Sequence, residues 1–330
     1  MPTIPVMMGL MDPLYNLFGW ILSKMYLWIE DYGLVIIVFT IFINVILLPF
    51  SIKSQKGMLK QQGLQDEINE IKRQFPDDPQ TQQQLQQELF QKNGISMTSG
   101  CLPSFLRLFL ILPVFRIFQK PLQYIGGVSA DNITKISDYL VNRNLLTDQN
   151  VKMLARSDIQ IISALQDNAS ALGTAVEKGW IKLNQLIDLD FLGINLGRTP
   201  SWRPSDIFGA ESRVYLPLLI LPVLTIVAMI IQMKLTTKIS QAKVVDKEEV
   251  ERAKKNPARS QQVQGNQGTE GMMKSMNIMM IVLMVTTVFA LPSAMGIYWV
   301  MNSVMSIAQS LFLYYFYTKP FRKALGNLEQ

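Results

Sequence analysis

The chain has 330 residues, of which 49% are hydrophobic and only 17% are charged, against about 25% charged residues in an average soluble domain. It contains no histidine and a single cysteine, Cys101, which excludes histidine-based acid/base catalysis, intrachain disulfides, and metal sites built from histidine or clustered cysteine. The net charge of +6 is compatible with a nucleic-acid partner. We favour another explanation of this charge, in which the basic residues flank membrane spans and set their orientation.

Two long stretches without charge exclude a water-soluble fold. Residues 214–233 and 275–318 contain no Asp, Glu, Lys or Arg. A helical span needs about 20 predominantly apolar residues, so the first stretch predicts one span and the second predicts two. The sequence therefore predicts an all-α polytopic membrane protein that uses no cofactor or metal.

The first 33 residues form the first predicted segment, outside the cytoplasm. Within it, residues 13–32 place apolar and aromatic side chains at helical spacing, which is typical of an amphipathic helix that lies in the membrane interface. The alternative is an extension of the following span. We expect no cleavable signal peptide, because no basic region precedes this helix.

Residues 34–52 form the first predicted span and residues 53–100 a cytoplasmic helical hairpin. Thr40 and Asn44 are four residues apart, so they share one face of the span. The hairpin has expected helices at 61–73 and 82–91. They are separated by a breaker sequence that contains Phe75, Pro76, Asp77 and Asp78.

Residues 101–124 form the second predicted span, which contains Arg107 and Arg116. These arginines are roughly half a turn out of phase, so we expect them on different faces. Residues 125–213 carry nine basic and ten acidic residues and predict a small helical segment outside the cytoplasm. Its helical part runs from 132 to 183, with interruptions at Gly173 and Gly179.

The remaining segments are three more spans, a basic loop and a basic tail. The predicted bounds are 214–233 for the third span, 234–274 for the loop, 275–291 and 296–317 for the fourth and fifth spans, and 318–330 for the tail. Lys and Arg number six in the hairpin, nine in the loop and three in the tail, but one in residues 1–33. The positive-inside rule therefore places the N-terminus outside and the C-terminus in the cytoplasm.

Polar residues at similar depth in three spans point to a function. Arg107 lies about 9 Å from the cytoplasmic end of its span and Asn44 about 13 Å from the end of its own, and a charge at such a place costs roughly 2.5–3.5 kcal/mol. Asn302, Ser306 and Gln309 form one stripe at i, i+4, i+7. We favour a water-filled groove open to the cytoplasm. The alternative is that Arg107 reaches the inner headgroups and the amides join helices.

Catalytic patterns are missing from the sequence. It has no phosphate-binding loop, no pair of acids inside a span, and no intramembrane serine with a histidine or lysine base. We therefore expect no enzymatic activity.

The order of features resembles the YidC/Oxa/Alb family of membrane-protein insertases, in its five-span form from Gram-positive bacteria. The resemblance rests on PLYNLFGWI, LLPFSIKSQK, SGCLP at the start of the second span, and ALPSAMGIYW followed by Asn302 and Gln309. It covers residues 13–124 and 187–325.

The resemblance implies five core helices around a hydrophilic groove that is closed to the outside. It also implies insertion and folding of single-span and multi-span proteins in the bacterial plasma membrane without ATP hydrolysis, alone or with the Sec translocon. The partners implied are nascent membrane proteins, the lipid bilayer, Sec and the ribosome, with no other nucleic-acid contact. The hairpin turn would receive the substrate. The groove residues expected are Thr40, Asn44, Ser104, Arg107, Trp299, Asn302, Ser306 and Gln309.

Two features depart from the family pattern. Family members carry an Arg in the first span, five residues before the proline, where this chain has Asn44. The position of Arg107 is commonly polar and uncharged in the family, which leads to the hypothesis that the positive charge of the groove has moved from span one to span two. The segment 125–186 is also longer than the loop usual in the family.

Two other function classes remain open. A small-solute transporter or channel with a half-membrane cavity would predict internal repeats, and we find none. A scaffold that recruits ribosomes through the basic loop and tail is compatible with insertion.

Overall fold

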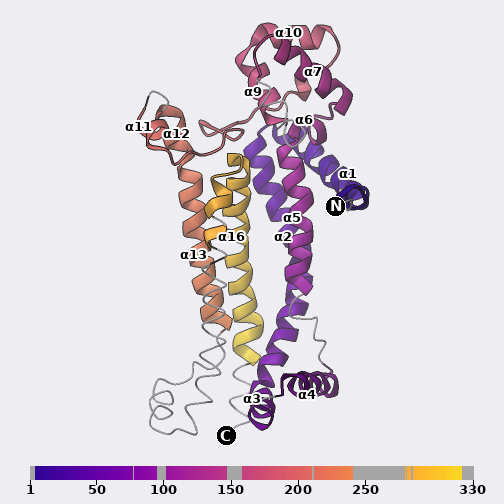
Figure 1. Ribbon diagram of the computed structural model, residues 1–330, viewed down its shortest axis with the longest axis vertical. Helices are drawn as coiled ribbons and strands as arrows, with labels where there is room; N and C mark the ends of the chain where they lie inside the picture. Colours follow the sequence, from indigo (N-terminus) through magenta and orange to yellow (C-terminus); the bar gives the residue numbers. More distant parts are fainter. Residues whose placement is uncertain are drawn as a thin grey trace. The chain divides into compact units, whose positions relative to one another are not determined.

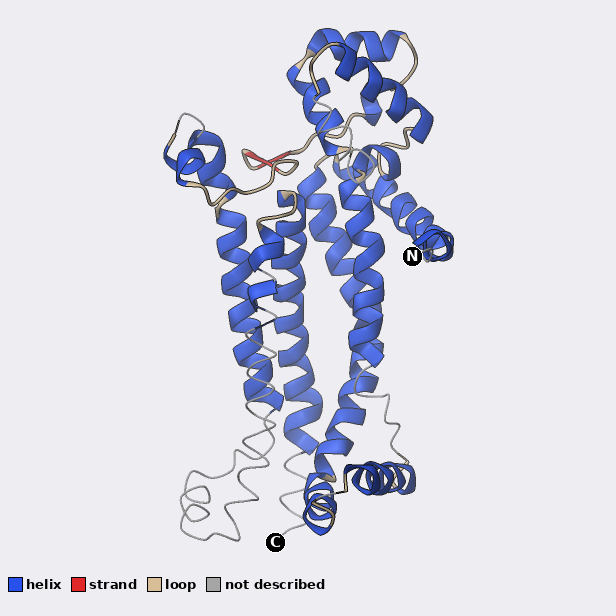
Figure 2. Cartoon of the chain, in the orientation of Figure 1, coloured by secondary structure: helices blue, strands red, loops and turns tan. Residues whose placement is uncertain are grey.

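The computed structural model is mostly helical and describes the backbone of residues 4–76, 78–94, 102–146, 158–209, 212–240, 279, 281–283 and 285–321 (Figure 1; Figure 2). The chain divides into two compact units, which we describe one at a time. The first consists of Met1–Phe42, Arg107–Thr225 and Val285–Met301, and the second of Ile43–Leu106, Ile226–Met284 and Asn302–Gln330.

Two segments among the described residues are long and apolar enough to cross a membrane. They are Tyr32–Gln61, within helix α2 (Tyr32–Gly63), and Ser212–Thr236. The second segment comprises α12 (Ser212–Leu218) and most of α13 (Ile220–Ser240). They coincide with the first and third predicted spans.

The other predicted spans are mostly helical where the structure describes them, but their crossing of the membrane stays a prediction. Helix α5 (Leu102–Gln119) lies in the predicted second span. Helix α16 (Ser293–Leu313) lies in the predicted fifth span and continues into a π-helical turn, Tyr314–Thr318. In the predicted fourth span, 275–291, residues 279, 281–283 and 285–288 are helical, and residues 275–278, 280 and 284 fall outside the described residues.

Helix boundaries differ from the sequence prediction at two prolines. Helix α2 continues through Pro49 to Gly63, well beyond the predicted end at 52, because good helix formers follow the proline. Helix α5 ends at Gln119, and a short helix α6 (Pro121–Tyr124) follows. The break falls at Lys120 because the residue before a proline is disfavoured in the helical region.

A sharp break separates the N-terminal helix α1 (Ile4–Ile29) from α2 in the first unit. Glu30 adopts a left-handed backbone conformation with φ 55°, which ends α1. The carboxylate of Asp31 accepts a hydrogen bond of 2.8 Å from the backbone N–H of Leu34 and so caps the start of α2. Residues 13–29 of the predicted amphipathic segment 13–32 therefore lie in α1, which begins earlier than expected, at Ile4, and is distinct from α2, to which Tyr32 already belongs.

Aromatic side chains form much of the core where α1, α2, α5 and α16 meet in the first unit. The rings of Tyr32 and Phe118 lie 6.4 Å apart, and those of Phe118 and Tyr298 lie 6.0 Å apart. Phe18 on α1 packs edge-to-face on Phe39 at 5.6 Å. Such edge-to-face pairs add to the free energy gained by burial alone.

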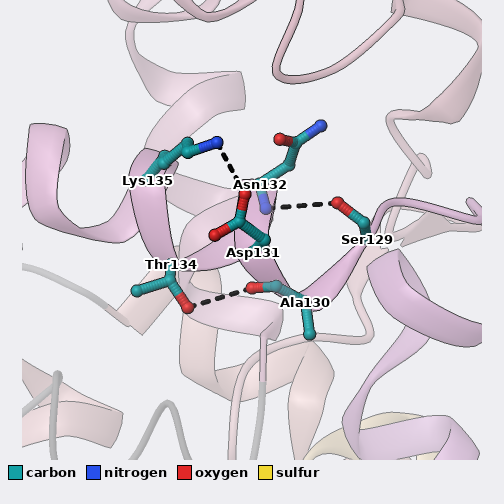
Figure 3. A network of polar contacts seen from close by, with 6 residues as sticks. All are labelled: Ser129, Ala130, Asp131, Asn132, Thr134 and Lys135. Carbon is teal, nitrogen blue, oxygen red and sulfur yellow. Dashed lines mark hydrogen bonds and ion pairs between the residues drawn. The ribbon is translucent and has the colours of Figure 1, made fainter.

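A cluster of helices follows α6 in the first unit. It contains α7 (Ala130–Asn142), α9 (Ile159–Asp167) and α10 (Ala169–Glu177). Figure 3 shows how α7 begins: the Ser129 hydroxyl accepts from the Asn132 N–H at 3.2 Å, and Lys135 pairs with Asp131 at 2.6 Å. The side-chain hydroxyl of Thr134 donates to the Ala130 carbonyl in the same turn.

The glycines and strands of this segment depart from the prediction. Gly173 lies inside α10 and does not interrupt it, whereas Gly179 follows the helix with φ 68°. Two short antiparallel strands, β1 (Asp190–Phe191) and β2 (Ile194–Asn195), also occur in a chain expected to be all-α. The ring of Phe191 lies where a side chain at Gly33 would have to be, so this contact requires glycine at the start of α2.

The second unit contains the hairpin, with α3 (Gln65–Gln74) and α4 (Pro79–Lys92). The helices start and end within a few residues of the predicted 61–73 and 82–91. Helix α4 begins earlier than expected because Asp78 caps it, accepting from the Thr81 N–H at 3.0 Å, and because proline is favoured in the first turn of a helix.

A buried carboxylate joins the helical cluster to α6. Asp158 is 1% exposed and accepts hydrogen bonds from the backbone N–H groups of Leu122 at 3.3 Å and Gln123 at 3.0 Å. Its own N–H donates to the carbonyl of Gln119 at 3.0 Å. Burial raises the pKa of Asp158 to about 7, although the two N–H donors and the nearby Lys120 act in the opposite direction.

We predict that the protein becomes less stable as the pH rises from about 4 to about 7. Folded Asp158 keeps its proton up to about pH 7, whereas an unfolded aspartic acid loses it near pH 3.9, so the folded state binds more protons in this window. Because the pKa of Asp158 differs between the folded and the unfolded state, the free energy of unfolding should fall by up to about 4 kcal/mol across this window. Thermal unfolding in detergent at several pH values measures it.

Asp158→Asn should flatten this pH profile. Asp131→Asn is the matched control, because Asp131 is an exposed carboxylate of the same segment, paired with Lys135. Identical pH profiles for Asp158→Asn and the unmodified protein would contradict the prediction.

Candidate functional site

The polar stripe predicted on the last span is joined to the first span by an amide pair. In the second unit, the Asn44 side chain on α2 donates from Nδ2 to Oδ1 of Asn302 on α16 at 3.4 Å. Asn44 is only 7% exposed. The helices therefore bring together two of the residues expected in the groove, although their sequence separation is 258.

A second pair joins the same stripe to α13. The side chain of Gln232 donates from Nε2 to Oγ of Ser306 at 2.9 Å, and Ser306 is 7% exposed. Asn302 and Ser306 are one helical turn apart, so both pairs follow one face of α16. We call these four residues, Asn44, Asn302, Gln232 and Ser306, the polar seam.

The far end of α16 contacts α2 through polar and aromatic groups. Gln55 donates from Nε2 to the Thr318 hydroxyl at 3.2 Å, and the Lys56 ammonium lies 5.0 Å from the centre of the Tyr317 ring. Thr318 ends the π-helical turn and is 1% exposed. π-Turns of this kind are frequent at functional sites.

The other residues expected in the groove have different settings. Thr40 donates to the Ile36 carbonyl of its own helix at 2.6 Å, and Trp299 is 5% exposed in the core of the first unit. Gln309 is half-buried on α16. Ser104 and Arg107 lie on α5, but their side chains fall outside the described residues, and the structure therefore does not bear on their part in a groove.

The hairpin turn is held by local hydrogen bonds. Gln82 donates from its side chain to the carbonyl of Phe75, and Pro76 is exposed. Hydrogen bonds from the Thr81 hydroxyl and N–H hold the pKa of the exposed Asp78 below its usual value, so this turn stays negatively charged. Asp77 falls outside the described residues.

Sequence reasoning missed Gln232 and Thr225. Gln232 is a neutral amide in the charge-free stretch 214–233, and that amide was the only signal available. In the first unit, the Thr225 hydroxyl is fully buried, and it donates to the carbonyls of Leu221 at 2.8 Å and Gly296 at 3.4 Å. Both side chains join α13 to α16, as amides and hydroxyls do between membrane helices.

The seam supplies neutral hydrogen-bonding groups inside an apolar bundle. Amide and hydroxyl groups can exchange their mutual hydrogen bonds for bonds to water or to a polar segment that passes between the helices.

Comparisons with known proteins point to one family. The family described as 60Kd inner membrane protein matches residues 24–320. Membrane protein insertase YidC from Caldanaerobacter subterraneus subsp. tengcongensis is 35% identical over 101 residues, which are 31% of this chain and 49% of the relative. The protein of the same name from Oceanobacillus iheyensis is 36% identical over 95 residues, or 28% and 38%.

A third relative is Membrane protein insertase YidC 2 from Bacillus anthracis, which is 37% identical over 109 residues, or 32% of this chain and 39% of the relative. The chain therefore spans less than half the length of the curated relatives it matches here.

We predict a measurable coupling between Gln232 and Ser306. In a double-mutant cycle of Gln232→Leu and Ser306→Ala, the free energy of unfolding in bicelles should show a coupling of about 0.6 kcal/mol, with about 1.7 kcal/mol as the upper end for such pairs. The reason is that each single substitution removes the same hydrogen bond.

Ser303 provides the control for this cycle, because it is 5% exposed on the same helix and is not the residue that accepts from Gln232. Combining Ser303→Ala with Gln232→Leu should give additive effects. Additivity in the Ser306 cycle as well would show that the pair contributes no coupling.

Proposed function

The chain belongs to the family of 60Kd inner membrane proteins, whose profile matches residues 24–320, and from this premise we propose that it is a membrane-protein insertase. The curated relatives named Membrane protein insertase YidC support the proposal. The activity is insertion, without ATP hydrolysis, of membrane proteins into the bacterial plasma membrane. The observation that carries it is the family match over most of the chain.

The proposed topology has five spans, with the N-terminus outside and the C-terminus in the cytoplasm. The spans are those expected from sequence, 34–52, 101–124, 214–233, 275–291 and 296–317. The excess of Lys and Arg in residues 53–100, 234–274 and 318–330 supports this orientation. Helix α1 then lies in the outer interface, where its exposed Trp20 and Trp28 are 62% and 93% accessible.

The polar seam lines the proposed groove, which opens to the cytoplasm. Asn44, Asn302 and Ser306 are buried or half-buried on facing helices, and Gln309 continues the stripe. Arg107 supplies the positive charge of the groove in place of the family arginine that is absent at Asn44. The support for this is the resemblance to the family, which implies an arginine at the position of Asn44 and commonly a polar, uncharged residue at that of Arg107.

The groove lowers the cost of moving a hydrophilic tail through a hydrocarbon layer about 30 Å thick. Water and hydrogen-bonding side chains that reach halfway shorten the apolar path. Arg107 attracts acidic residues of the tail. The membrane potential, worth about 2.3 kcal/mol per charge per 100 mV, then drives these acidic groups outward.

The cytoplasmic hairpin receives the substrate in this mechanism. Its turn is acidic and exposed at Asp78. Helix α3 has buried Ile68 on its apolar side and charged residues elsewhere. The basic loop 234–274 and the tail 318–330 contact the ribosome, and the Sec translocon is a partner for multi-span substrates.

We predict that depletion of the chain selectively removes single-span proteins with short tails from the membrane. The reason is that such proteins have no other route that shortens the apolar path. Quantitative membrane proteomics after depletion measures the effect. A defect in solute accumulation with unchanged membrane proteins would favour the small-solute transporter instead.

A separate prediction concerns the charge at Arg107. Arg107→Ala should reduce insertion of substrates with acidic tails in a depletion strain, whereas Arg107→Lys should largely restore it because the charge is kept. Adding Asn44→Arg to Arg107→Ala should also restore insertion, since it returns the charge to similar depth.

Arg116→Ala is the matched control. Arg116 lies on the same helix α5, three residues before its end at Gln119. Insertion should survive its loss. If Arg107→Ala leaves every tested substrate inserted, the charge has no such role.

A further inference from the structure

Three large apolar side chains stand exposed within a short part of the segment that precedes α12. Leu192 in the turn between β1 and β2 is 86% exposed, Trp202 is 72% exposed, and Phe208 at the end of α11 (Pro204–Phe208) is 84% exposed. We call these three residues the apolar rim. Single exposed apolar residues are ordinary, so what distinguishes these three is their place in the fold.

The turn that contains Leu192 has two residues in the left-handed backbone region and a side-chain hydrogen bond. Leu192 has φ 53° and Gly193 has φ 78°. The Asp190 carboxylate accepts from the Gly193 N–H at 2.9 Å. A left-handed conformation is unfavourable for leucine, and asparagine or glycine would be accommodated at lower cost. A large apolar side chain is therefore held at the tip of this turn against its local preference.

The chain places the rim beside the ends of membrane helices. Phe208 lies four residues before Ser212, where the apolar segment Ser212–Thr236 begins. The carbonyl of Arg198 accepts from both the N–H of Ser293, at 2.9 Å, and its hydroxyl, at 2.8 Å. The Ala294 N–H donates to the Leu196 carbonyl at 3.0 Å.

These bonds attach the strand region to the first turn of α16, and Figure 2 shows the two strands, in red, next to the start of that helix. All these residues belong to the first unit. A segment fixed to the start of α16 and joined closely to the start of α12 must lie at the level of the membrane surface when Ser212–Thr236 crosses the bilayer.

We propose that the apolar rim inserts into the outer leaflet of the lipid bilayer and forms a membrane contact separate from α1. Trp and Phe are suited to the boundary between headgroups and acyl chains. Arg198, Arg203 and Arg213 lie in the same stretch, and all three side chains are exposed. Their aliphatic stems can follow the apolar surface while the guanidinium groups reach lipid phosphates.

Lipid fits this surface better than a protein partner for a geometric reason. The three side chains come from a turn, a loop and a helix end, and each is largely exposed. A bilayer accepts separate side chains at one depth, whereas a protein partner needs one continuous complementary surface. The proposal depends on the crossing of Ser212–Thr236 and on the proposed orientation of the chain, and it is independent of the insertase activity.

The depth of Trp202 tests the proposal. The full-length chain, with its other four tryptophans changed to phenylalanine, is reconstituted in phosphatidylethanolamine and phosphatidylglycerol vesicles containing phosphatidylcholine brominated near the headgroup end of its acyl chains. The brominated lipid should quench Trp202 fluorescence strongly, and aqueous iodide should quench it weakly. A parallel variant that keeps only Trp180, which packs on Tyr139 at 5.8 Å inside the helical cluster, should show little quenching by lipid.

Two outcomes would overturn the proposal. Quenching of Trp202 by iodide and not by brominated lipid would place the rim in water. Shielding from both quenchers would place it against protein, such as a second copy of the chain.

A second label tests the proposal independently, in case the tryptophan variants do not fold. A nitroxide on Phe208→Cys, in a Cys101→Ser background with all tryptophans kept, should collide more with oxygen than with a water-soluble nickel chelate. The opposite preference would contradict insertion. Changing both Leu192 and Phe208 to serine should also reduce the quenching of Trp202 by brominated lipid. Unchanged quenching would show that the three residues of the rim do not insert as one contact.

Discussion

A polar side chain that faces hydrocarbon inside a bilayer has no water to bind, so it needs a partner on its own helix or on another helix. The polar seam meets this requirement by pairing Asn44 with Asn302 and Gln232 with Ser306. The pairs fix how α2 and α13 are rotated about α16 in the second unit, because a rotated helix would leave an amide in hydrocarbon.

The first unit depends on a different kind of contact. Here polar groups cap the ends of helices and form hydrogen bonds between separate segments of the chain. Asp31 caps α2 where Glu30 has ended α1, and the Arg198 carbonyl receives the start of α16. Asp158 links α6 to the helical cluster through two backbone N–H groups. These interactions give the loops defined positions near the helix ends. The proposal that the apolar rim lies at the membrane surface depends on these positions.

Much of the fold could be predicted from charge and spacing alone. The charge-free stretch at 214–233 marks one of the two described apolar segments, and the hairpin helices lie near their expected ranges because Asp78 and the following proline end the breaker. The spacing of Asn302 and Ser306 also identified one face of α16. The partner Gln232 could not be found in this way, because one neutral amide says nothing about the rotation of α13. The two-residue strands and the burial of Asp158 depend on contacts between distant segments, which no local pattern contains.

Insertion by the purified chain is the most direct test of the proposed activity. A single-span substrate with a short acidic tail is added to vesicles that contain only this protein, without ATP, and entry of the tail is followed by protection from protease. Protection should exceed that in protein-free vesicles and should increase when the vesicle interior is made electrically positive, which favours inward movement of the acidic tail. Equal protection in vesicles with and without the chain would contradict its role as an insertase.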